Sequence, residues 1–306
     1  MKKQRILDIY LKFLENKEVT IKDISEEYDV SPRSIQRDIR DLRTFFQLAA
    51  IPADIIYEPS IKGYVMRDDN RNQLTNDEIL AVCKILLESR AFVKEEMMRI
   101  IDKIVNLCVP RANYKVIGKM LDNEKYHYNE PHHRKKFLGK LWNIGNAIQQ
   151  QLKIRITYTK TNNESVKRVL HPVGLMFSEF YFYLLAFIEN ADKSKFRNPD
   201  DLFPTIYRVD RIKSLKVTKE NFPVVYIKDR FEEGLFRKRV QFMTGGKLRK
   251  IRFKYFGRSL EAVLDRLPTA VVKAQYKSYA LIEAEVFGDG IEAWIRGQGK
   301  DVEVIG

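Results

Sequence analysis

Apolar residues recur every three or four positions through the first fifty residues, and this spacing predicts three helices. The first covers residues 2–15, and a short second helix begins after Thr20, which can cap it. Ser31-Pro32 marks the start of a third helix, because serine is a favoured N-cap and proline fits the first helical position. This third helix extends to about Leu48, and it carries one apolar stripe made of Ile35, Ile39, Leu42 and Phe46.

A hairpin follows the three helices. Residues 54–57 and 63–66 are short segments with strand composition, and a turn containing Pro59 and Lys62 joins them. Three helices followed by such a hairpin predict a winged helix-turn-helix domain over residues 1–67.

The next stretch is helical. A polar linker is predicted over residues 68–72, and Thr75 and Glu78 form a capping box that opens a helix to about Ser89. Further helices are predicted over 93–108 and 132–150, whereas residues 111–130 show no clear pattern. We expect residues 68–136 to form a helical linker.

From Leu152 the spacing of apolar residues changes to every second position, which is typical of a half-buried strand. Ile154, Ile156 and Tyr158 alternate with polar residues in the first such strand. Further strands are predicted over residues 165–170, 174–177, 181–188, 205–209 and 212–218. Several short strands at close spacing predict a small β-barrel over residues 137–243.

After Gly245-Gly246 the pattern alternates between strands and helices. The predicted order is strand 249–256, helix 258–267, strand 270–276, strand 279–286, helix 289–298 and strand 301–305. This order fits a ferredoxin-like sandwich over residues 244–306. The whole chain is therefore predicted to be a multidomain α+β protein.

The net charge of +14 is concentrated in one part of the 306-residue chain. Residues 131–260 hold 28 Lys and Arg against 11 Asp and Glu, whereas residues 1–67 are close to neutral. Basic proteins tend to associate with polyanions. The predicted barrel, whose strands are rich in Tyr and Phe, is therefore the main candidate for binding a polyanion, by phosphate attraction and base stacking.

The two cysteines, Cys83 and Cys108, both lie in apolar helical patterns. They are predicted to be buried free thiols instead of a disulfide. No apolar run approaches the ~18 residues of a membrane span, and no signal-peptide pattern opens the chain. We expect a cytoplasmic protein with no membrane partner.

The third helix carries candidate DNA-reading residues on the side opposite its apolar stripe. Arg forks onto guanine edges and Gln onto adenine edges in the major groove, and a helix N-terminus with Ser residues suits a phosphate. The predicted DNA-binding residues are Ser31, Arg33, Ser34, Gln36, Arg37, Arg40 and, in the hairpin, Lys62. An ordinary solvated helix face is the alternative interpretation.

Asp38 and Asp41 lie on the same helix and are expected to weaken non-specific DNA binding. Each domain is then expected to bind modestly, and a homodimer on paired half-sites of a duplex operator would compensate.

Four segments in order resemble the WYL-domain transcriptional regulators. Residues 3–46 resemble their N-terminal winged helix-turn-helix, and residues 168–175 resemble the segment before the motif that names the family. That motif appears as Phe182-Tyr183-Leu184, with Phe where Trp is usual, and residues 207–212 resemble the closing arginine signature. The C-terminal sandwich resembles the extension that follows the WYL domain.

This resemblance implies an Sm-like barrel that binds a regulatory ligand, often single-stranded nucleic acid or a nucleotide. It also implies a homodimer. The residue types favour the same interpretation, since Arg208 and Arg211 flank a strand end and can clamp a phosphate. The predicted ligand pocket contains Tyr158, Arg168, His171, Tyr183, Arg208 and Arg211. Structural roles remain open for several of them: Tyr158 and Tyr183 in the core, His171 as a hydrogen-bonding group, and Arg211 paired with Asp210 or Glu179.

Other functional classes are less well supported. No HExxH, GxSxG, Walker or GxGxxG motif occurs, and adjacent His132 and His133 do not have metal-ligand spacing, so we expect no catalysis, no cofactor and no metal. Two binding alternatives remain: an accessory protein that binds RNA or single-stranded DNA without recognising an operator, and a regulator that senses a small acidic metabolite.

Overall fold

The computed structural model describes residues 2–14, 18–49, 51, 53–68, 74–108, 112–192, 194, 196, 203–223 and 231–305. They form two compact units. The first consists of Met1–Arg90 and Lys94–Asn129, and the second of Ala91–Val93 and Glu130–Gly306. The finer division into four domains stays a prediction.

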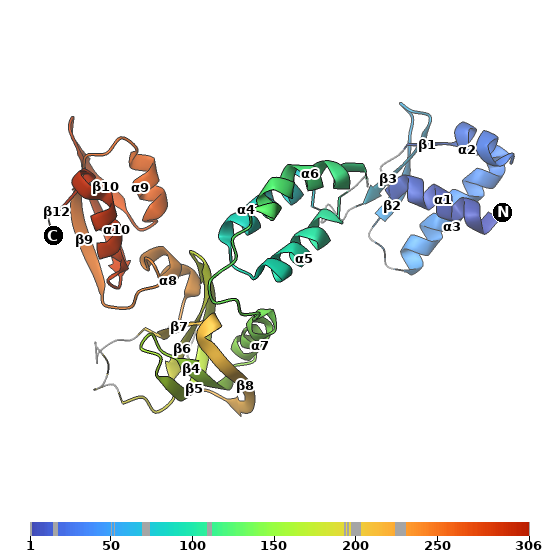
Figure 1. Cartoon of the computed structure of the whole chain (residues 1–306). Helices are drawn as coiled ribbons and strands as arrows, with labels where there is room; N and C mark the ends of the chain where they lie inside the picture. Colours follow the sequence, from blue (N-terminus) through green and yellow to red (C-terminus); the bar gives the residue numbers. More distant parts are fainter. Residues whose placement is uncertain are drawn as a thin grey trace. The chain divides into compact units, whose positions relative to one another are not determined.

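The N-terminal part of the first unit contains the predicted helices and hairpin (Figure 1). Its elements are α1 (Lys2–Leu14), β1 (Val19–Thr20), α2 (Ile21–Tyr28), α3 (Pro32–Leu48), β2 (Ala53–Glu58) and β3 (Gly63–Asp68). The three strands form an antiparallel sheet in the order β1-β3-β2. Strand β1 was not predicted, because two residues are too few to show a period of two.

The apolar stripe of α3 is buried as the spacing predicted. Ile35, Ile39, Leu42 and Phe46 pack in one core with residues of α1, α2 and β2. Thr20 caps α2, since its hydroxyl accepts a hydrogen bond from the Asp23 N–H at 3.1 Å. Ser31 occupies the N-cap position of α3, but its side chain makes no capping bond.

An ion pair lies inside this core, which the sequence did not predict. Arg5 Nε donates to Asp38 Oδ2 at 2.6 Å, and both residues are buried. Asp38 falls three residues after Ile35 and four before Leu42, so it lies on the buried side of α3. The carboxylate of Asp38 on α3 therefore points into the core, where the guanidinium of Arg5 on α1 neutralises its charge.

Three helices complete the first unit: α4 (Asn76–Ser89), α5 (Lys94–Val105) and α6 (Ala112–Tyr126). The capping box is confirmed, because the Thr75 hydroxyl accepts from Glu78 N–H and the Glu78 carboxylate accepts from Thr75 N–H. Helix α6 occupies the stretch that showed no clear pattern. Cys83 and Cys108 are buried free thiols, as predicted.

The second unit contains one helix packed on a five-stranded antiparallel sheet. Its elements are α7 (Leu138–Gln149), β4 (Leu152–Thr159), β5 (Ser165–Ser178), β6 (Tyr181–Ile188), β7 (Thr205–Arg208), the 3-10 turn η2 (Val209–Arg211) and β8 (Ile212–Asn221). The strand order is β7-β6-β5-β4-β8. Among the described strands β7 and β8 stay at the two edges, so the sheet is open and the closed barrel that we predicted is not formed.

Strand β5 corrects a second prediction. Residues 165–170 and 174–177 were predicted as separate strands, but they form one strand with a register shift between Pro172 and Gly174. Proline cannot donate a hydrogen bond to the ladder, and a bulge accommodates it without ending the strand. Beyond the bulge, Gly174 and Met176 share a face of the sheet with His171.

Strand β6 is buried on both faces. Tyr183 and Leu185 pack in a cluster with Phe236 of α8 (Glu233–Arg239) and Phe287, whereas Leu184 on the other face is fully buried. The sequence left open which face is core, and the structure shows that both are. Helix α8 was not predicted.

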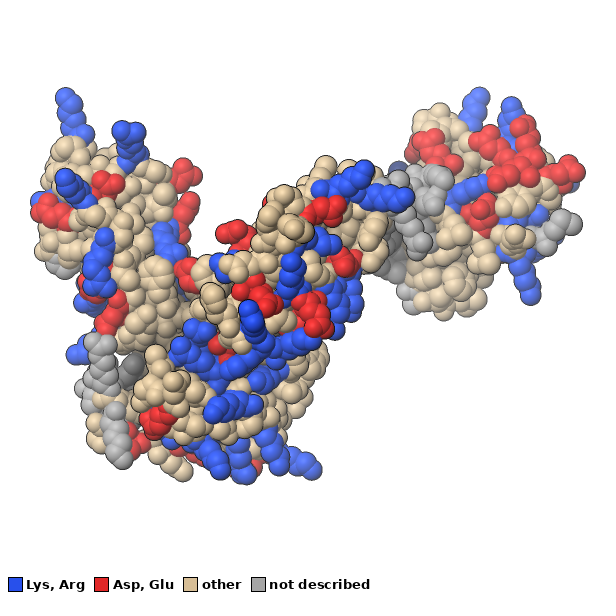
Figure 2. Space-filling view, in the orientation of Figure 1, with Lys and Arg blue, Asp and Glu red and all other residues tan. Residues whose placement is uncertain are grey.

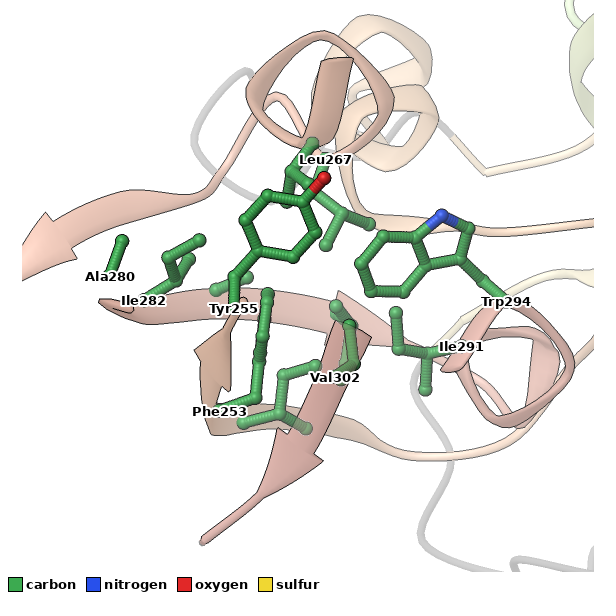
Figure 3. Close-up of a cluster of buried hydrophobic side chains, with 12 residues drawn as sticks. Phe253, Tyr255, Leu267, Ala280, Ile282, Ile291, Trp294 and Val302 are labelled. Carbon is green, nitrogen blue, oxygen red and sulfur yellow. The ribbon is translucent and has the colours of Figure 1, made fainter. Parts of the chain in front are cut away.

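The C-terminal part follows the predicted order of elements: β9 (Leu248–Tyr255), α9 (Leu260–Arg266), β10 (Val271–Gln275), β11 (Ala280–Phe287), α10 (Gly290–Gln298), η4 (Gly299–Asp301) and β12 (Val302–Val304). The sheet is antiparallel in the order β10-β11-β9-β12. Trp294 of α10 and Leu267 beyond α9 meet Phe253, Tyr255 and Ile282 of the sheet in one apolar core (Figure 3).

Two glycine-containing turns come close together before β9 and after β11. Gly288 has φ +83°, and a Cβ there would lie 1.9 Å from the carbonyl oxygen of Thr244. At Gly290 a Cβ would lie 1.8 Å from the carbonyl oxygen of Gln241. Both positions require glycine, because the approaching atoms belong to the backbone.

No helix among the described residues is long and apolar enough to cross a membrane.

Candidate nucleic-acid interface and ligand site

The side of α3 opposite the core carries a row of polar residues. Arg33, Gln36, Arg37 and Arg40 are all exposed. Within the described part of the chain, none of the three arginines makes an ion pair, so their guanidinium groups are available to a partner. They lie three or four residues apart on one helix face, which is the arrangement that base reading in a major groove requires.

The remaining predicted DNA-binding residues lie at the start of α3 and at the hairpin tip. Ser31 and Ser34 place their hydroxyl oxygens 3.1 Å apart, and Lys62 is exposed in the turn between β2 and β3 with φ +52°. Arg43 fixes the hairpin to the helix, since its Nε donates to the Ile55 carbonyl at 2.6 Å. The wing and α3 are therefore held together as one body.

The two acidic residues of α3 differ from our expectation. Asp38 faces the core and pairs with Arg5, so its charge is not on the exposed face. Asp41 is half-exposed and pairs with Lys2 at 3.0 Å. Both aspartates are paired with cations from α1, so the exposed row of α3 is more positive than a count of all charged residues of the helix indicated.

The six predicted ligand residues do not form a single pocket. Cross-strand partners share a sheet face, so the register sorts them. Arg168 pairs with Ile156 and shares a face with Tyr158, whereas His171 pairs with Phe187 on the opposite face. Tyr183 pairs with Arg208, and alternation along β6 from Phe187, the partner of His171, places both on the His171 side.

Tyr158 has a structural role within this arrangement. Its ring meets that of Tyr207 edge-on with centroids 5.0 Å apart, and its hydroxyl accepts from the Arg208 backbone N–H at 3.4 Å. Burial raises the pKa of Tyr207 to about 12. Both tyrosines are buried.

Arg208 is held by Asp210. Its Nε and Nη2 donate to the two carboxylate oxygens at 3.0 and 2.9 Å, and its guanidinium lies 3.4 Å from the ring centroid of Tyr181. Burial lowers the pKa of Arg208, but the hydrogen bonds and charge of Asp210 outweigh it and raise the pKa above the ordinary value. The fork that we predicted to clamp a phosphate therefore already holds a carboxylate.

Arg211 does not join that clamp. Its Nη1 donates to Thr161 Oγ1 at 2.9 Å. The alternative partners that the sequence offered are also wrong: Asp210 pairs with Arg208, and Glu179 lies 3.4 Å from Arg266.

His133 lies beside this arginine, and sequence reasoning missed it. Burial lowers the pKa of His133, and the nearby charges of Asp210 and Arg208 act on it in opposite directions. Its Nδ1 accepts from the Lys135 N–H at 2.9 Å, which leaves the proton of the neutral ring on Nε2. His133, Tyr181, Tyr183, Arg208 and Asp210 thus form one cluster, which we call the Arg208 cluster.

His171 belongs to a different group. Its ring stacks on Phe222 with centroids 5.1 Å apart, and Nε2 lies 3.6 Å from Glu189 Oε1. Lys153 also pairs with Glu189, and its hydrogen bond holds the pKa of that carboxyl below the ordinary value. The outer face of the sheet is therefore a polar network at this point, and Lys167 and Lys216 are exposed nearby on β5 and β8. Figure 2 shows Lys and Arg gathered over the part of the second unit that contains this sheet.

A cavity of about 770 Å³ lies elsewhere in the second unit, lined by residues such as Phe203, Ile206, Met243 and Phe287. It contains none of the six predicted ligand residues. The described residues hold no group of three or more His, Cys, Asp or Glu that is arranged to bind a metal ion.

Family models match two parts of the chain. An HTH domain matches residues 5–65, and a WYL domain matches residues 139–217. This chain is a WYL-domain protein with an N-terminal HTH domain. The resemblance that the sequence motifs indicated is therefore confirmed. No curated protein matches the chain in sequence.

Two solved structures are similar at low identity. Proteasome accessory factor B/C (PafBC) of Arthrobacter aurescens matches 99% of this chain and 44% of its own length, at 17% identity and a TM-score of 0.30. A CRISPR Cas-related protein matches 67% of this chain and 56% of its own, at 17% identity and a TM-score of 0.38. This chain thus spans about half the length of each, and similarity at this level carries no argument about function.

Proposed function

We propose that this WYL-domain protein is a DNA-binding transcriptional regulator that reads a duplex operator with α3. The observation that carries the proposal is the exposed row of Arg33, Gln36, Arg37 and Arg40, opposite the buried stripe of the same helix. The row is unpaired within the described residues, and Arg43 holds the wing in place beside it.

The test is selection of preferred duplex sites from random DNA, followed by binding measurements on variants of the full chain. Arg37→Ala is expected to weaken binding to the selected site by ~1–3 kcal/mol, or about 5- to 150-fold, and to relax specificity at one position. Arg37→Lys keeps the charge but loses the bidentate fork, so most of the loss should remain.

Arg252→Ala is the matched control, because Arg252 is also an exposed arginine but lies on the C-terminal sheet. Equal losses from Arg37→Ala and Arg252→Ala would mean that charge alone drives binding, and the proposal would fail. Failure of the selection to yield any preferred duplex would reject it as well.

We further propose that the basic sheet of the WYL domain senses an anion, either single-stranded nucleic acid or a nucleotide. Support comes from the 28 Lys and Arg between residues 131 and 260 and from the tyrosines beside Arg208. An incoming phosphate would compete with Asp210 for the guanidinium of Arg208, and the other predicted residues would contribute from their own faces.

Arg208→Ala is expected to remove the effect of oligonucleotides and nucleotides on operator binding while basal operator binding stays intact. Because this change also leaves the buried Asp210 unpaired, Arg208→Lys serves as a second variant that retains a cation. Arg252→Ala, at an exposed arginine outside the six predicted ligand residues, is the comparison. An unchanged response in both Arg208 variants would reject the sensing site.

The alternative is an accessory protein that binds RNA or single-stranded DNA through the basic sheet. The concentration of positive charge between residues 131 and 260, and not in the N-terminal domain, favours it. It predicts tight binding of single strands and no effect of Arg37→Ala.

A further inference from the structure

The cavity of about 770 Å³ in the second unit has no part in the sites described above. Its lining comes from two sheets: the end of β6 and the start of β7 in one, and the start of β9 and the end of β11 in the other, together with residues 243–247. Cavities that bind small molecules measure ~300–1,000 Å³ and combine apolar walls with a few polar groups. The volume of this cavity is therefore that of a small-molecule site.

Aromatic and aliphatic side chains form the apolar wall of the cavity. The ring centroids of Phe203 and Phe287 lie 4.3 Å apart, and Ile206 and Met243 pack in the same cluster. Phe287 and Met243 are buried, whereas Phe203 and Ile206 are only partly buried. An apolar molecule placed against this wall would remove further apolar surface from water, which favours its binding.

A loop that lines the cavity is held by the turn after β11. Asp289 N–H donates to the Gly245 carbonyl at 3.2 Å, and Gly288 N–H donates to the Lys247 carbonyl at 3.0 Å. Gly246 has φ +154°, and a Cβ there would lie 2.8 Å from the Gly288 Cα. These contacts fix the loop, so this part of the lining is formed before a ligand binds.

The same loop offers hydrogen-bond donors and a cation. Among the residues that the structure describes, the backbone N–H groups of Gly245, Gly246 and Lys247 donate no hydrogen bond, and the Lys247 ammonium makes no ion pair. Arg249, the other cation of the lining, pairs with Glu292. Successive backbone N–H groups bind anions in many proteins, and a neighbouring cation adds to the attraction.

We propose that this cavity binds an apolar monocarboxylate. Its apolar body lies against Phe203, Ile206 and Phe287, and its carboxylate accepts hydrogen bonds from the Lys247 ammonium and the N–H groups of the loop.

Charge and shape favour this class of ligand over nucleotides and nucleic acids. The Asp289 carboxylate also lines the cavity, so a group with two or more negative charges is repelled while only Lys247 is available to balance it. A nucleic-acid strand needs an open, basic groove along its backbone, and this lining is mostly apolar. The cavity shares no residue with the α3 row or with the six predicted ligand residues, so the inference does not rest on the proposed function.

Isothermal titration calorimetry of the full chain tests the proposal with phenylacetate, indole-3-acetate and octanoate. At least one acid is expected to bind, and its uncharged amide should bind at least ~10-fold more weakly, because the amide offers no charge to Lys247. The acid should also raise the unfolding temperature of the second unit as its concentration increases, since it binds only the folded form.

Variants of the lining separate its two parts. Lys247→Ala should weaken binding of the acid at least ~10-fold and leave binding of the amide unchanged. Lys250→Ala is the matched control, because Lys250 is also an exposed lysine but does not line the cavity. Ile206→Trp adds an aromatic ring to the apolar wall and should weaken binding of acid and amide alike. Circular dichroism confirms that each variant is folded.

Three results would overturn the proposal: no binding by any of the acids, equal effects of Lys247→Ala and Lys250→Ala on the acid, or AMP that displaces the bound acid and loses affinity in Lys247→Ala. The proposed function is tested separately. Arg37→Ala and Arg208→Lys should bind the acid as the unaltered chain does, so failure of operator reading or of sensing at Arg208 leaves this result unaffected.

Discussion

The buried ion pair between Arg5 and Asp38 yields a quantitative prediction about the DNA-reading helix. Asp38 is fully buried and Arg5 is 5% exposed, so neither charge is solvated when its partner is removed. Breaking a buried pair from one side costs about 3–5 kcal/mol, because an uncompensated charge remains inside. Asp38→Ala should therefore destabilise the N-terminal domain by that amount.

Native-state hydrogen exchange of the α3 amides is the appropriate assay, since a multidomain chain does not unfold in one two-state step. A loss of 3–5 kcal/mol corresponds to exchange about 150- to 4,000-fold faster. Domains are stable by only ~5–15 kcal/mol, so the loss removes a large share of the stability of the DNA-reading helix without touching a DNA contact.

Two further variants isolate the cause. Arg5→Met combined with Asp38→Leu removes both charges and should recover most of the stability. Lys2→Ala breaks the exposed pair with Asp41 and should change stability by at most ~1 kcal/mol. The reasoning is refuted if Asp38→Ala accelerates exchange less than tenfold, or if the double variant is no more stable than the single one.

Three other predictions concern the interior of the two units. Burial lowers the pKa of His133, so the folded form holds fewer protons than the unfolded chain below pH ~6.5, and the second unit should lose stability as the pH falls through that range. His133→Gln should flatten the dependence of the unfolding temperature of the second unit on pH, whereas His132→Gln should not. Burial raises the pKa of Cys83 to about 11, so neither buried thiol should react with a disulfide reagent at pH 8 until denaturant is added; prompt reaction of the native chain would contradict this. Gly288→Ala should destabilise the C-terminal part by at least ~1–2 kcal/mol in denaturant melts, because φ is positive and the Cβ meets a backbone carbonyl; Gly297→Ala, which meets nothing within 4 Å, should be neutral or stabilising.

Local periodicity was sufficient for most of the elements and for the exposed face of α3. The helices of the N-terminal domain, its hairpin and the C-terminal order of strands and helices were all predicted, because each follows from residues a few positions apart. The exposed arginine row on α3 follows from the same spacing, since the opposite face had to be apolar. The capping box at Thr75 is likewise a local motif.

Contacts between distant residues were not predictable in this way. Arg5 and Asp38 are 33 positions apart, and nothing near Asp38 in the sequence distinguishes a buried aspartate from an exposed one. Arg208 and Asp210 are only two residues apart, but the sequence offered Asp210 as a partner of Arg211 and not of Arg208. His133 was considered only as a metal ligand and set aside for its spacing from His132, and only the fold brings it beside Arg208.

The sequence by itself determined which segments become helix or strand and which side of α3 meets solvent, because these properties depend on the period of apolar residues along the chain. The tertiary structure decided how the ligand residues are distributed. The pairing register of β4, β5, β6 and β7 places Tyr158 and Arg168 on one side of the sheet and His171, Tyr183 and Arg208 on the other. Register depends on pairing between strands that are far apart in sequence, and alternation within one strand carries no information about it.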